Sequence, residues 1–213
     1  MDWDVVSRLG ELIGTVAFAV TAVLAVAPQR VSLFTACVMG TITAVGGGTI
    51  RDVITDQPVF WSIDPTYIWV ALVASIAAFW AHRFFARGKV FQTMLYLDAL
   101  GVALFAVQSA GIVWRLDFGL PVAPVILGIV TAIGGGLLRD VLAGRQTMLM
   151  NEEIYAVPVL LGTSVLVVLM SIFPDLWEIN SAIGFAIIFG IRAAAIRWNL
   201  RWPDWLNSKP DQK

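Results

Sequence analysis

The sequence carries the same unusual motif twice, each time within a long apolar segment. Residues 40–54 read GTITAVGGGTIRDVI and residues 128–142 read GIVTAIGGGLLRDVL, so a triple glycine precedes an Arg-Asp pair at two places 88 positions apart. The segments before the motifs also match, because GTVAFAV begins at Gly14 and GVALFAV begins at Gly101. Internal repeats of this kind are typical of membrane transport folds, and they predict two similar halves.

The composition places these halves in a membrane. Of 213 residues, 59% are hydrophobic and 14% are charged, and the mean hydropathy is +0.82, which departs from the usual balance of a soluble domain. A spanning helix needs about 20 mostly apolar residues, with about 17 as the lower limit. Seven segments meet this requirement, at 12–28, 33–54, 66–85, 95–112, 122–143, 154–173 and 180–197. We therefore expect an all-α membrane protein with seven transmembrane helices in a single domain, residues 1–213.

Three predicted helices make up each repeat, at about 5–88 and 92–175. Because three is an odd number, the second repeat must cross the membrane in the opposite direction to the first. The sequence thus predicts two inverted three-helix repeats, related by an axis in the membrane plane. A seventh helix at about 180–197 and a polar tail at 198–213 follow them.

The distribution of basic residues predicts the orientation. Cytoplasmic loops are enriched in Lys and Arg, and alternate loops collect nearly all of them on one side, against only Arg8 and Arg115 on the other. The residues on the predicted cytoplasmic side are Arg30, Arg83, Arg87, Lys89, Arg145, Arg197, Arg201, Lys209 and Lys213. We expect a multi-pass protein of the cell inner membrane, in contact with lipid, with its N-terminus outside and its C-terminus in the cytoplasm.

The glycine triplets allow two interpretations. Three glycines in a row weaken a helix, because glycine costs up to about 1 kcal/mol relative to alanine. Carbonyl groups freed by a break are tolerated at membrane depth where they line a cavity. Alternatively, small residues let two helices pack closely. The repetition favours a cavity, and the glycines concerned are Gly46, Gly47, Gly48, Gly134, Gly135 and Gly136.

Charged side chains within the predicted spans form the second group of candidate residues. Each costs about 2.5 to 3.5 kcal/mol to insert, so such residues usually face a bundle interior or water and find partners. The alternative is that the arginines extend to the membrane surface. We expect two ionic clusters on opposite sides of a glycine-lined constriction, an outer one of Glu11, Arg51 and Asp52 and an inner one of Asp98, Arg139 and Asp140.

Several functional classes are excluded or disfavoured. The glycine motif lacks the GK[ST] ending of a nucleotide-binding P-loop. One cysteine, Cys37, and one histidine, His82, leave too little material for a catalytic triad or a metal site. The net charge of −1 gives no basic field for nucleic acid. We expect no enzyme activity, no metal or cofactor, no nucleic acid and no soluble partner.

Two GGG-x-x-RD motifs on the second helices of inverted repeats, followed by a seventh helix, resemble the prokaryotic trimeric intracellular cation (TRIC) channels. The resemblance covers roughly residues 5–200. It implies a homotrimer in which each protomer has its own pathway, between the glycine-kinked second and fifth helices, for potassium and possibly sodium. By motif position, the six glycines would be the kinks, and Arg51 and Arg139 would lie along or beside the pore.

An arginine beside a cation pathway needs a neutralising partner or must act as a gate. Asp52 and Asp140 follow their arginines directly, about 100° further around the helix, so they need not neutralise them. Partners from other helices, Glu11 and Asp98, are the expected alternative. Hydroxyl groups that could contact cations or water, or else bond to their own helical turn, are those of Thr15, Thr43, Thr49 and Thr131.

A second function stays open on the sequence alone. Inverted repeats with broken helices also serve secondary transporters. An Arg-Asp pair beside free helix ends would hold the carboxylate and the ammonium of a small zwitterion such as glycine. Conduction and saturable uptake distinguish the two functions.

Overall fold

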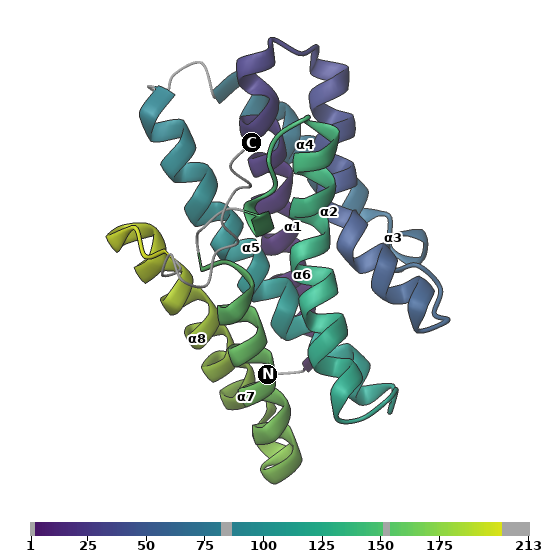
Figure 1. Cartoon of the computed structure of the whole chain (residues 1–213). Helices are drawn as coiled ribbons and strands as arrows, with labels where there is room; N and C mark the ends of the chain where they lie inside the picture. Colours follow the sequence, from purple (N-terminus) through teal and green to yellow (C-terminus); the bar gives the residue numbers. More distant parts are fainter. Residues whose placement is uncertain (1–2, 82–86, 151–153, 202–213) are drawn as a thin grey trace, which may run out of the picture.

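Long helices joined by short connections make up the chain (Figure 1). The computed structural model describes residues 3–81, 87–150 and 154–201. The long helices are α1 (Trp3–Val26), α2 (Leu33–Ile54), α4 (Thr66–Ala81), α5 (Arg87–Arg115), α6 (Val122–Leu142), α7 (Ala156–Ile172) and α8 (Trp177–Trp198). The short helical segments are η1 (Ala27–Gln29), α3 (Phe60–Ile63), η3 (Met148–Met150) and η4 (Pro174–Leu176).

Five of the segments are long and apolar enough to cross a membrane: Arg8–Gln29, Leu33–Ile54, Phe91–Arg115, Val122–Leu142 and Pro174–Trp198. Two further apolar helices, α4 and α7, are shorter, at 16 and 17 residues. The predicted span 66–85 ends in residues that lie outside the described part of the chain. The chain is therefore an all-helical membrane protein, as its composition predicts.

The predicted boundaries need correction at several helix ends. The first helix was expected at 12–28 but begins at Trp3, and the fourth was expected at 95–112 but extends over Arg87–Arg115. Hydropathy marks only the part of a helix that lies in hydrocarbon, whereas backbone hydrogen bonding continues into the polar interface. The segment after α2, expected as a loop, also contains the short helix α3.

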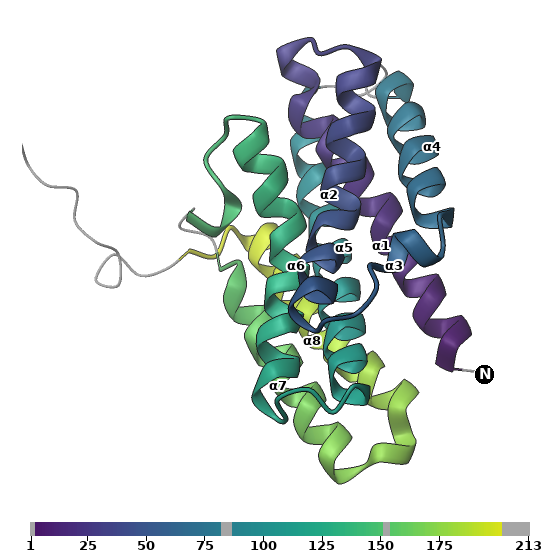
Figure 2. The same cartoon turned by 90° about the vertical axis from the view of Figure 1, so that its right-hand side faces the viewer.

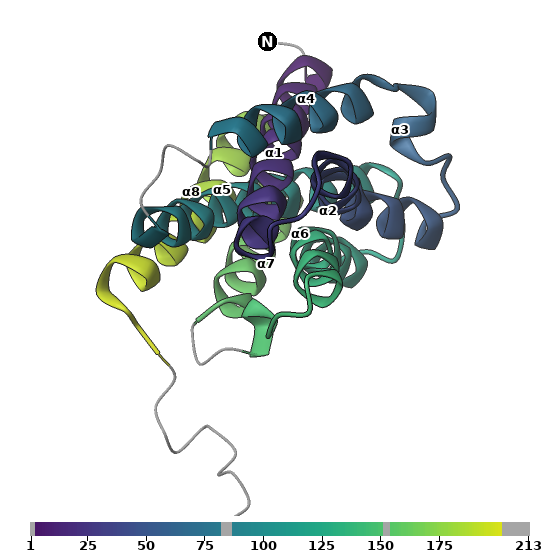
Figure 3. The same ribbon diagram turned by 90° about the horizontal axis from the view of Figure 1, so that it is seen from above.

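The helices pack as two similar groups with α1 and α5 against each other at the centre. α2 packs on α6, α4 packs on α1 and α2, and α7 packs on α5 and α6. Seen from above, α2 and α6 lie side by side (Figure 3), and they also do so in the view of Figure 2. α8 is the additional helix, and it packs on α5 and α7.

Two phenylalanines fill the centre between α1 and α5. The rings of Phe18 and Phe105 are buried, and their centroids lie 5.2 Å apart. A Cβ atom on Gly14 would lie 3.0 Å from the Phe105 ring, and one on Gly101 would lie 2.5 Å from the Phe18 ring. The matched GTVAFAV and GVALFAV segments therefore meet here, and the glycine of each segment packs against the phenylalanine of the other segment.

Local sequence signals determine where α2 and α6 begin and end. Ser32 is the N-cap of α2, and its Oγ accepts a hydrogen bond from the Thr35 N–H at 3.1 Å, as N-cap serines commonly do. Shortly after each Arg-Asp pair the chain turns left-handed, at Asp56 (φ 54°) and Gly144 (φ 62°). This conformation stops a helix, so both motifs lie in the last turns of their helices.

Candidate functional site

The glycine triplets lie where α2 crosses α6. A Cβ atom on Gly47 would collide with the carbonyl oxygen of Thr131, and one on Gly135 would collide with the carbonyl oxygen of Thr43. Each helix thus presents two small residues four positions apart to the other, Thr43 and Gly47 on α2 and Thr131 and Gly135 on α6. This small-xxx-small spacing brings membrane helices into backbone contact. The crossing is reciprocal, because the two contacts exchange the same types of residue.

Both helices continue as α-helix through residues 46–48 and 134–136. The expectation that the triplets open the helices and free carbonyl groups is therefore not met in this conformation. Close packing, the other interpretation of the glycines, accounts for the middle glycine of each triplet. The helices stay intact at the glycines because packing of α2 against α6 stabilises the helical backbone, which offsets the low helix propensity of glycine.

The outer glycines of the triplets differ in their surroundings. A Cβ atom on Gly46 would lie 2.5 Å from the Leu138 side chain, and one on Gly48 would lie 2.6 Å from the Phe60 ring. At Gly134 the nearest atoms are 3.6 Å away, which is ordinary contact. A Cβ atom on Gly136 would lie 3.2 Å from the Tyr155 hydroxyl oxygen. Three of the four outer positions thus have a neighbour that is closer than ordinary contact.

The inner ionic cluster centres on Arg139, which is fully buried at 0% exposure. Its Nη1 lies 2.7 Å from Oδ1 of Asp98 and 3.1 Å from Oγ1 of Thr21, and its Nε lies 2.8 Å from Oδ1 of Asp140. The structure therefore brings together the three charged residues predicted for this cluster. Thr21, on α1, is an additional partner that the sequence reasoning missed.

One expectation about the aspartates is corrected. Asp52 and Asp140 lie about 100° further around the helix and were not expected to need to neutralise their neighbouring arginines, yet Arg51 and Asp52 are joined by contacts of 2.7 and 2.8 Å. Arg139 and Asp140 pair in the same way. The guanidinium group sits at the end of a long flexible stem, so it bends around the helix and reaches a carboxylate that is only about 100° away.

The outer cluster forms differently from the prediction. Glu11 accepts a hydrogen bond of 2.5 Å from the Tyr67 hydroxyl group, and Arg51 acts on it electrostatically. Within the described residues, no ion pair joins Glu11 to Arg51 directly. The ring of Phe60 covers Arg51 instead, with 5.8 Å from its centroid to Cζ. The two clusters are therefore similar in composition but different in their pairing.

Replacing Tyr67 by phenylalanine will lower the free energy of unfolding by about 1 to 2 kcal/mol, because a partly buried carboxylate loses its donor. Thermal unfolding of the purified protein, followed by tryptophan fluorescence, measures the change. Tyr96→Phe is the matched control, since this tyrosine lines an open groove. Equal effects of the two substitutions would show that the Glu11 contact contributes nothing specific.

A short segment covers each cluster and is fixed by the aspartate of the motif. Oδ2 of Asp52 accepts a hydrogen bond from the Phe60 N–H at 2.8 Å, and Oδ2 of Asp140 accepts one from the Met148 N–H at 3.1 Å. The sulfur of Met148 also lies 3.5 Å from Nη2 of Arg139. Each aspartate thus links its arginine to a segment, α3 or η3, that closes the end of the crossing.

The candidate hydroxyl groups have different environments. Thr15 donates to the carbonyl oxygen of Glu11 and Thr49 donates to that of Val45, both at 2.8 Å. Thr49 also accepts a 2.9 Å hydrogen bond from the indole N–H of Trp61. These two threonines therefore bond to their own helical turns. This was the alternative to contact with cations or water.

The remaining two threonines lie at the helix crossing and are buried. Oγ1 of Thr131 is 2.8 Å from Oγ of Ser109. Oγ1 of Thr43 is buried and has no hydrogen-bond partner among the described residues. A buried hydroxyl group without a partner is unfavourable, so Thr43 is the candidate with free capacity to bind.

Four aromatic or sulfur-containing residues belong to the site and were missed from the sequence. They are Tyr67 and Tyr155, beside the acidic residues of the clusters, and Phe60 and Met148, in the covering segments. In both pairs the separation is 88 positions, the same as that of the glycine motifs. This spacing was the signal that would have identified them.

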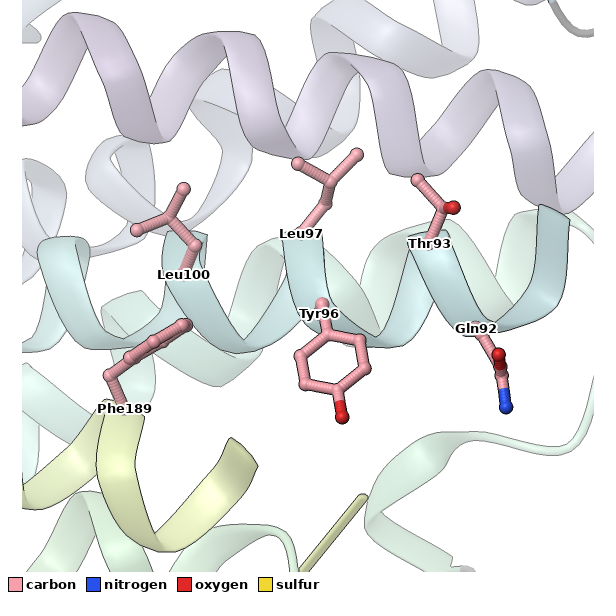
Figure 4. A pocket seen from close by; sticks show the side chains of 6 residues that line it. All are labelled: Gln92, Thr93, Tyr96, Leu97, Leu100 and Phe189. Atoms are coloured by element: carbon pink, nitrogen blue, oxygen red, sulfur yellow. The ribbon is translucent and has the colours of Figure 1, made fainter. Parts of the chain in front are cut away.

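At the inner cluster the space between side chains is too small to admit a water molecule. It is lined by Ile133, Gly136, Leu137, Asp140, Thr147, Met148, Leu149 and Tyr155. An open groove of about 550 Å³ lies elsewhere, on α5 and α8 (Figure 4), and its lining consists of Gln92, Thr93, Tyr96, Leu97, Leu100 and Phe189. No predicted site residue lines that groove.

A surface ion pair lies beside the outer cluster. Nη2 of Arg8 is 2.8 Å from Oδ2 of Asp64, and both side chains are partly or largely exposed. Hydrogen bonds from Thr66, together with the charge of Arg8, lower the pKa of the Asp64 carboxyl group. Exposed pairs of this kind contribute little to stability.

Comparison with known proteins identifies the family. The chain matches the family model described as "Glycine transporter" in two segments, residues 8–83 and 95–171. It is 38% identical over 195 residues to the UPF0126 inner membrane protein YadS of Escherichia coli K12, an alignment that covers 91% of this chain and 93% of YadS. A UPF0126 membrane protein of Vibrio cholerae is 30% identical over 204 residues, covering 93% and 82% of the two chains.

Solved structures give the same result. The TRIC channel orthologue of Rhodobacter sphaeroides superposes with a TM-score of 0.86 at 34% identity, covering 92% of this chain and 99% of that one. A second TRIC cation channel structure superposes with a TM-score of 0.84 at 27% identity over the full length of both chains. The chain belongs to the UPF0126 family of membrane proteins, the prokaryotic branch of the trimeric intracellular cation channel family.

Proposed function

We propose that the protein is a channel for monovalent cations, chiefly potassium, with sodium as a second permeant ion. The observation that carries this proposal is the likeness to the TRIC channel orthologue of Rhodobacter sphaeroides, which extends over nearly the whole of both chains at 34% identity. One pathway would run through each protomer, between α2 and α6. The function is transport, so it requires neither catalysis nor a cofactor.

The pairing of charges supports a cation pathway. A bare arginine would repel potassium, but Arg139 contacts the carboxylates of Asp98 and Asp140. These three ionised groups together carry a charge of −1, which favours a cation over an anion. In addition, Oδ2 of Asp98 is buried without a hydrogen-bond partner among the described residues. This oxygen is the proposed contact for a cation that reaches the inner end.

We propose that the pathway between α2 and α6 is closed in this conformation. The backbones of α2 and α6 touch at Gly47 and Gly135, and the inner crevice admits no water. Conduction therefore requires the two helices to separate or bend at the crossing. The triplets at 46–48 and 134–136 are the proposed bending points, because a helix without side chains at three successive positions resists bending least.

We propose seven spanning helices arranged as two inverted repeats followed by α8, with the N-terminus outside and the C-terminus in the cytoplasm. Equivalent contacts at a constant offset of 88 support the repeats, such as Asp52 with Phe60 and Asp140 with Met148. The family model also matches in two segments. The proposed location is the inner membrane, as for YadS. The proposed assembly is a homotrimer in lipid, and the description of the Rhodobacter sphaeroides orthologue as a trimeric channel supports three subunits.

A secondary transporter of glycine is the second candidate, because the matching family model carries the description "Glycine transporter". Planar-bilayer recording in asymmetric potassium chloride, with glycine then added to one side, distinguishes the two. We expect discrete unitary currents that reverse near the potassium potential and do not require glycine. Electrical silence combined with saturable glycine uptake into proteoliposomes would reject the channel and establish the transporter.

A further inference from the structure

A further buried arginine, besides Arg51 and Arg139, lies close to the inner cluster but on a different helix. Arg192 belongs to α8 and has 0% exposure. A charged group inside a membrane protein is costly to bury and usually has a functional or structural partner, so its contacts indicate its role.

Arg192 holds the residue that precedes α7. Its Cζ lies 4.6 Å from the centroid of the Tyr155 ring, and its Nη1 donates a 3.1 Å hydrogen bond to the carbonyl oxygen of Ile154. The first contact is a cation–π interaction, which is strengthened when the groups are shielded from water. The second fixes the backbone at the same point, so ring and main chain are held together.

The other end of Tyr155 reaches the inner cluster. Its hydroxyl oxygen lies 3.2 Å from the position of a Cβ atom on Gly136, and Oδ1 of Asp98 and Nη2 of Arg139 lie 3.4 and 3.5 Å from that same point. The ring is 3% exposed and lines the crevice that admits no water. Tyr155 therefore lies between Arg192 and Arg139, with the closed inner end beside it.

The outer half of the molecule offers a direct comparison. Tyr67, 88 positions earlier, donates from its hydroxyl group to Glu11 and packs edge to face on Phe60 at 4.8 Å. Its ring is thus supported by the covering segment α3. At the inner end the ring of Tyr155 is supported by a guanidinium group that comes from α8, the helix that follows both repeats.

We infer that Arg192 is a positioning residue that holds Tyr155 over the inner ionic cluster and thereby couples the opening of the inner end to α8. The inference rests on the proposed function in one respect, namely that the inner cluster borders the transport pathway. Arg192 itself does not line the crevice. Its loss should therefore change how often the pathway opens without changing how fast ions pass through it.

Single-channel recording of Arg192→Met tests whether the loss of Arg192 changes how often the pathway opens. We expect the ratio of open to closed time to rise about tenfold, as loss of one shielded cation–π contact implies, while unitary conductance is unchanged. Tyr155→Leu removes the same contact, so the double variant should show the effect of one substitution and not the product of two. Independent effects that multiply would overturn the coupling.

Thiol labelling tests the same inference without any current. In a Cys37→Ser background, Thr147→Cys places a thiol at a position that lines the crevice and is 6% exposed. A water-soluble methanethiosulfonate reagent should modify it about ten times faster once Arg192 is methionine. Ser62→Cys, in the exposed α3 segment, is the control and should react at an unchanged rate.

The two readouts separate the inference from the proposed function. Faster labelling without current in any variant, the unsubstituted protein included, would reject the channel and retain the role of Arg192. Normal currents with unchanged open time and unchanged labelling would overturn that role. Where Arg192→Met fails to give a single species on size-exclusion chromatography, Arg192→Lys decides, because it keeps the charge and loses the planar guanidinium. It should increase both readouts about threefold.

Discussion

Replacing Arg139 by methionine lowers the free energy of unfolding by about 3 to 5 kcal/mol, because it leaves buried carboxylates without their counter-ion. Asp98 is fully buried and Asp140 is 3% exposed, and both contact the same guanidinium group. Neither can turn to water in the closed conformation. Unfolding of the purified protein in detergent, followed by tryptophan fluorescence, measures the loss.

Two further variants make this prediction specific. Combining Arg139→Met with Asp98→Asn should recover part of the lost stability, since one of the stranded charges is removed. Arg8→Met serves as the matched control, because Arg8 also pairs with an aspartate but is 55% exposed, and exposed pairs contribute little. If Arg8→Met and Arg139→Met destabilised the protein equally, burial would not be the reason for the effect.

Gly47→Ala should destabilise the protein by about 3 kcal/mol, at the upper end of typical overpacking costs. The added methyl group would collide with the carbonyl oxygen of Thr131 on α6, and a backbone atom cannot move aside as a flexible side chain does. Gly135→Ala should behave alike, because it meets the carbonyl oxygen of Thr43. Comparing the melting temperatures of both variants with the parent protein measures the effect.

Gly190→Ala provides the control for a glycine in a membrane helix. No atom lies within 4 Å of a Cβ atom at this position in the described structure, so the substitution should leave stability unchanged or raise it by up to about 1 kcal/mol. Tolerance of alanine at both Gly47 and Gly135 would mean that the backbones of α2 and α6 are not in contact at the crossing.

The positions of the helices were largely predictable from sequence. Apolar runs of membrane-spanning length specify helices, because backbone groups in hydrocarbon must be satisfied within the segment. Within the described residues, each of the seven predicted segments overlaps a helix, and five of these helices are long and apolar enough to cross a membrane. The ends were less predictable: α5 begins at Arg87, eight residues before the predicted span, since charged residues at the interface are compatible with helix but invisible to hydropathy.

The composition of the inner cluster was also predictable, because few charged residues occur within the spans and each needs a partner. Its geometry was not. The pairing of Arg139 with both Asp98 and Asp140, and the contact to Thr21, depend on where three helices meet. The spacing of 88 positions from Tyr67 marks Tyr155 as part of the repeat. Its contacts with Arg192 and the inner cluster were not predictable, because they depend on segments that meet only after folding.

By itself, the sequence determined that the chain spans a membrane as helices, that it contains an internal repeat, and which glycines and charged residues carry the repeat. Tertiary structure decided how they are used. The middle glycines bring two backbones into contact, Glu11 binds Tyr67 and not Arg51, and Arg192 reaches Tyr155. The physical reason is that hydropathy and spacing act along one chain segment, whereas packing distance and charge pairing are properties of segments that meet only after folding.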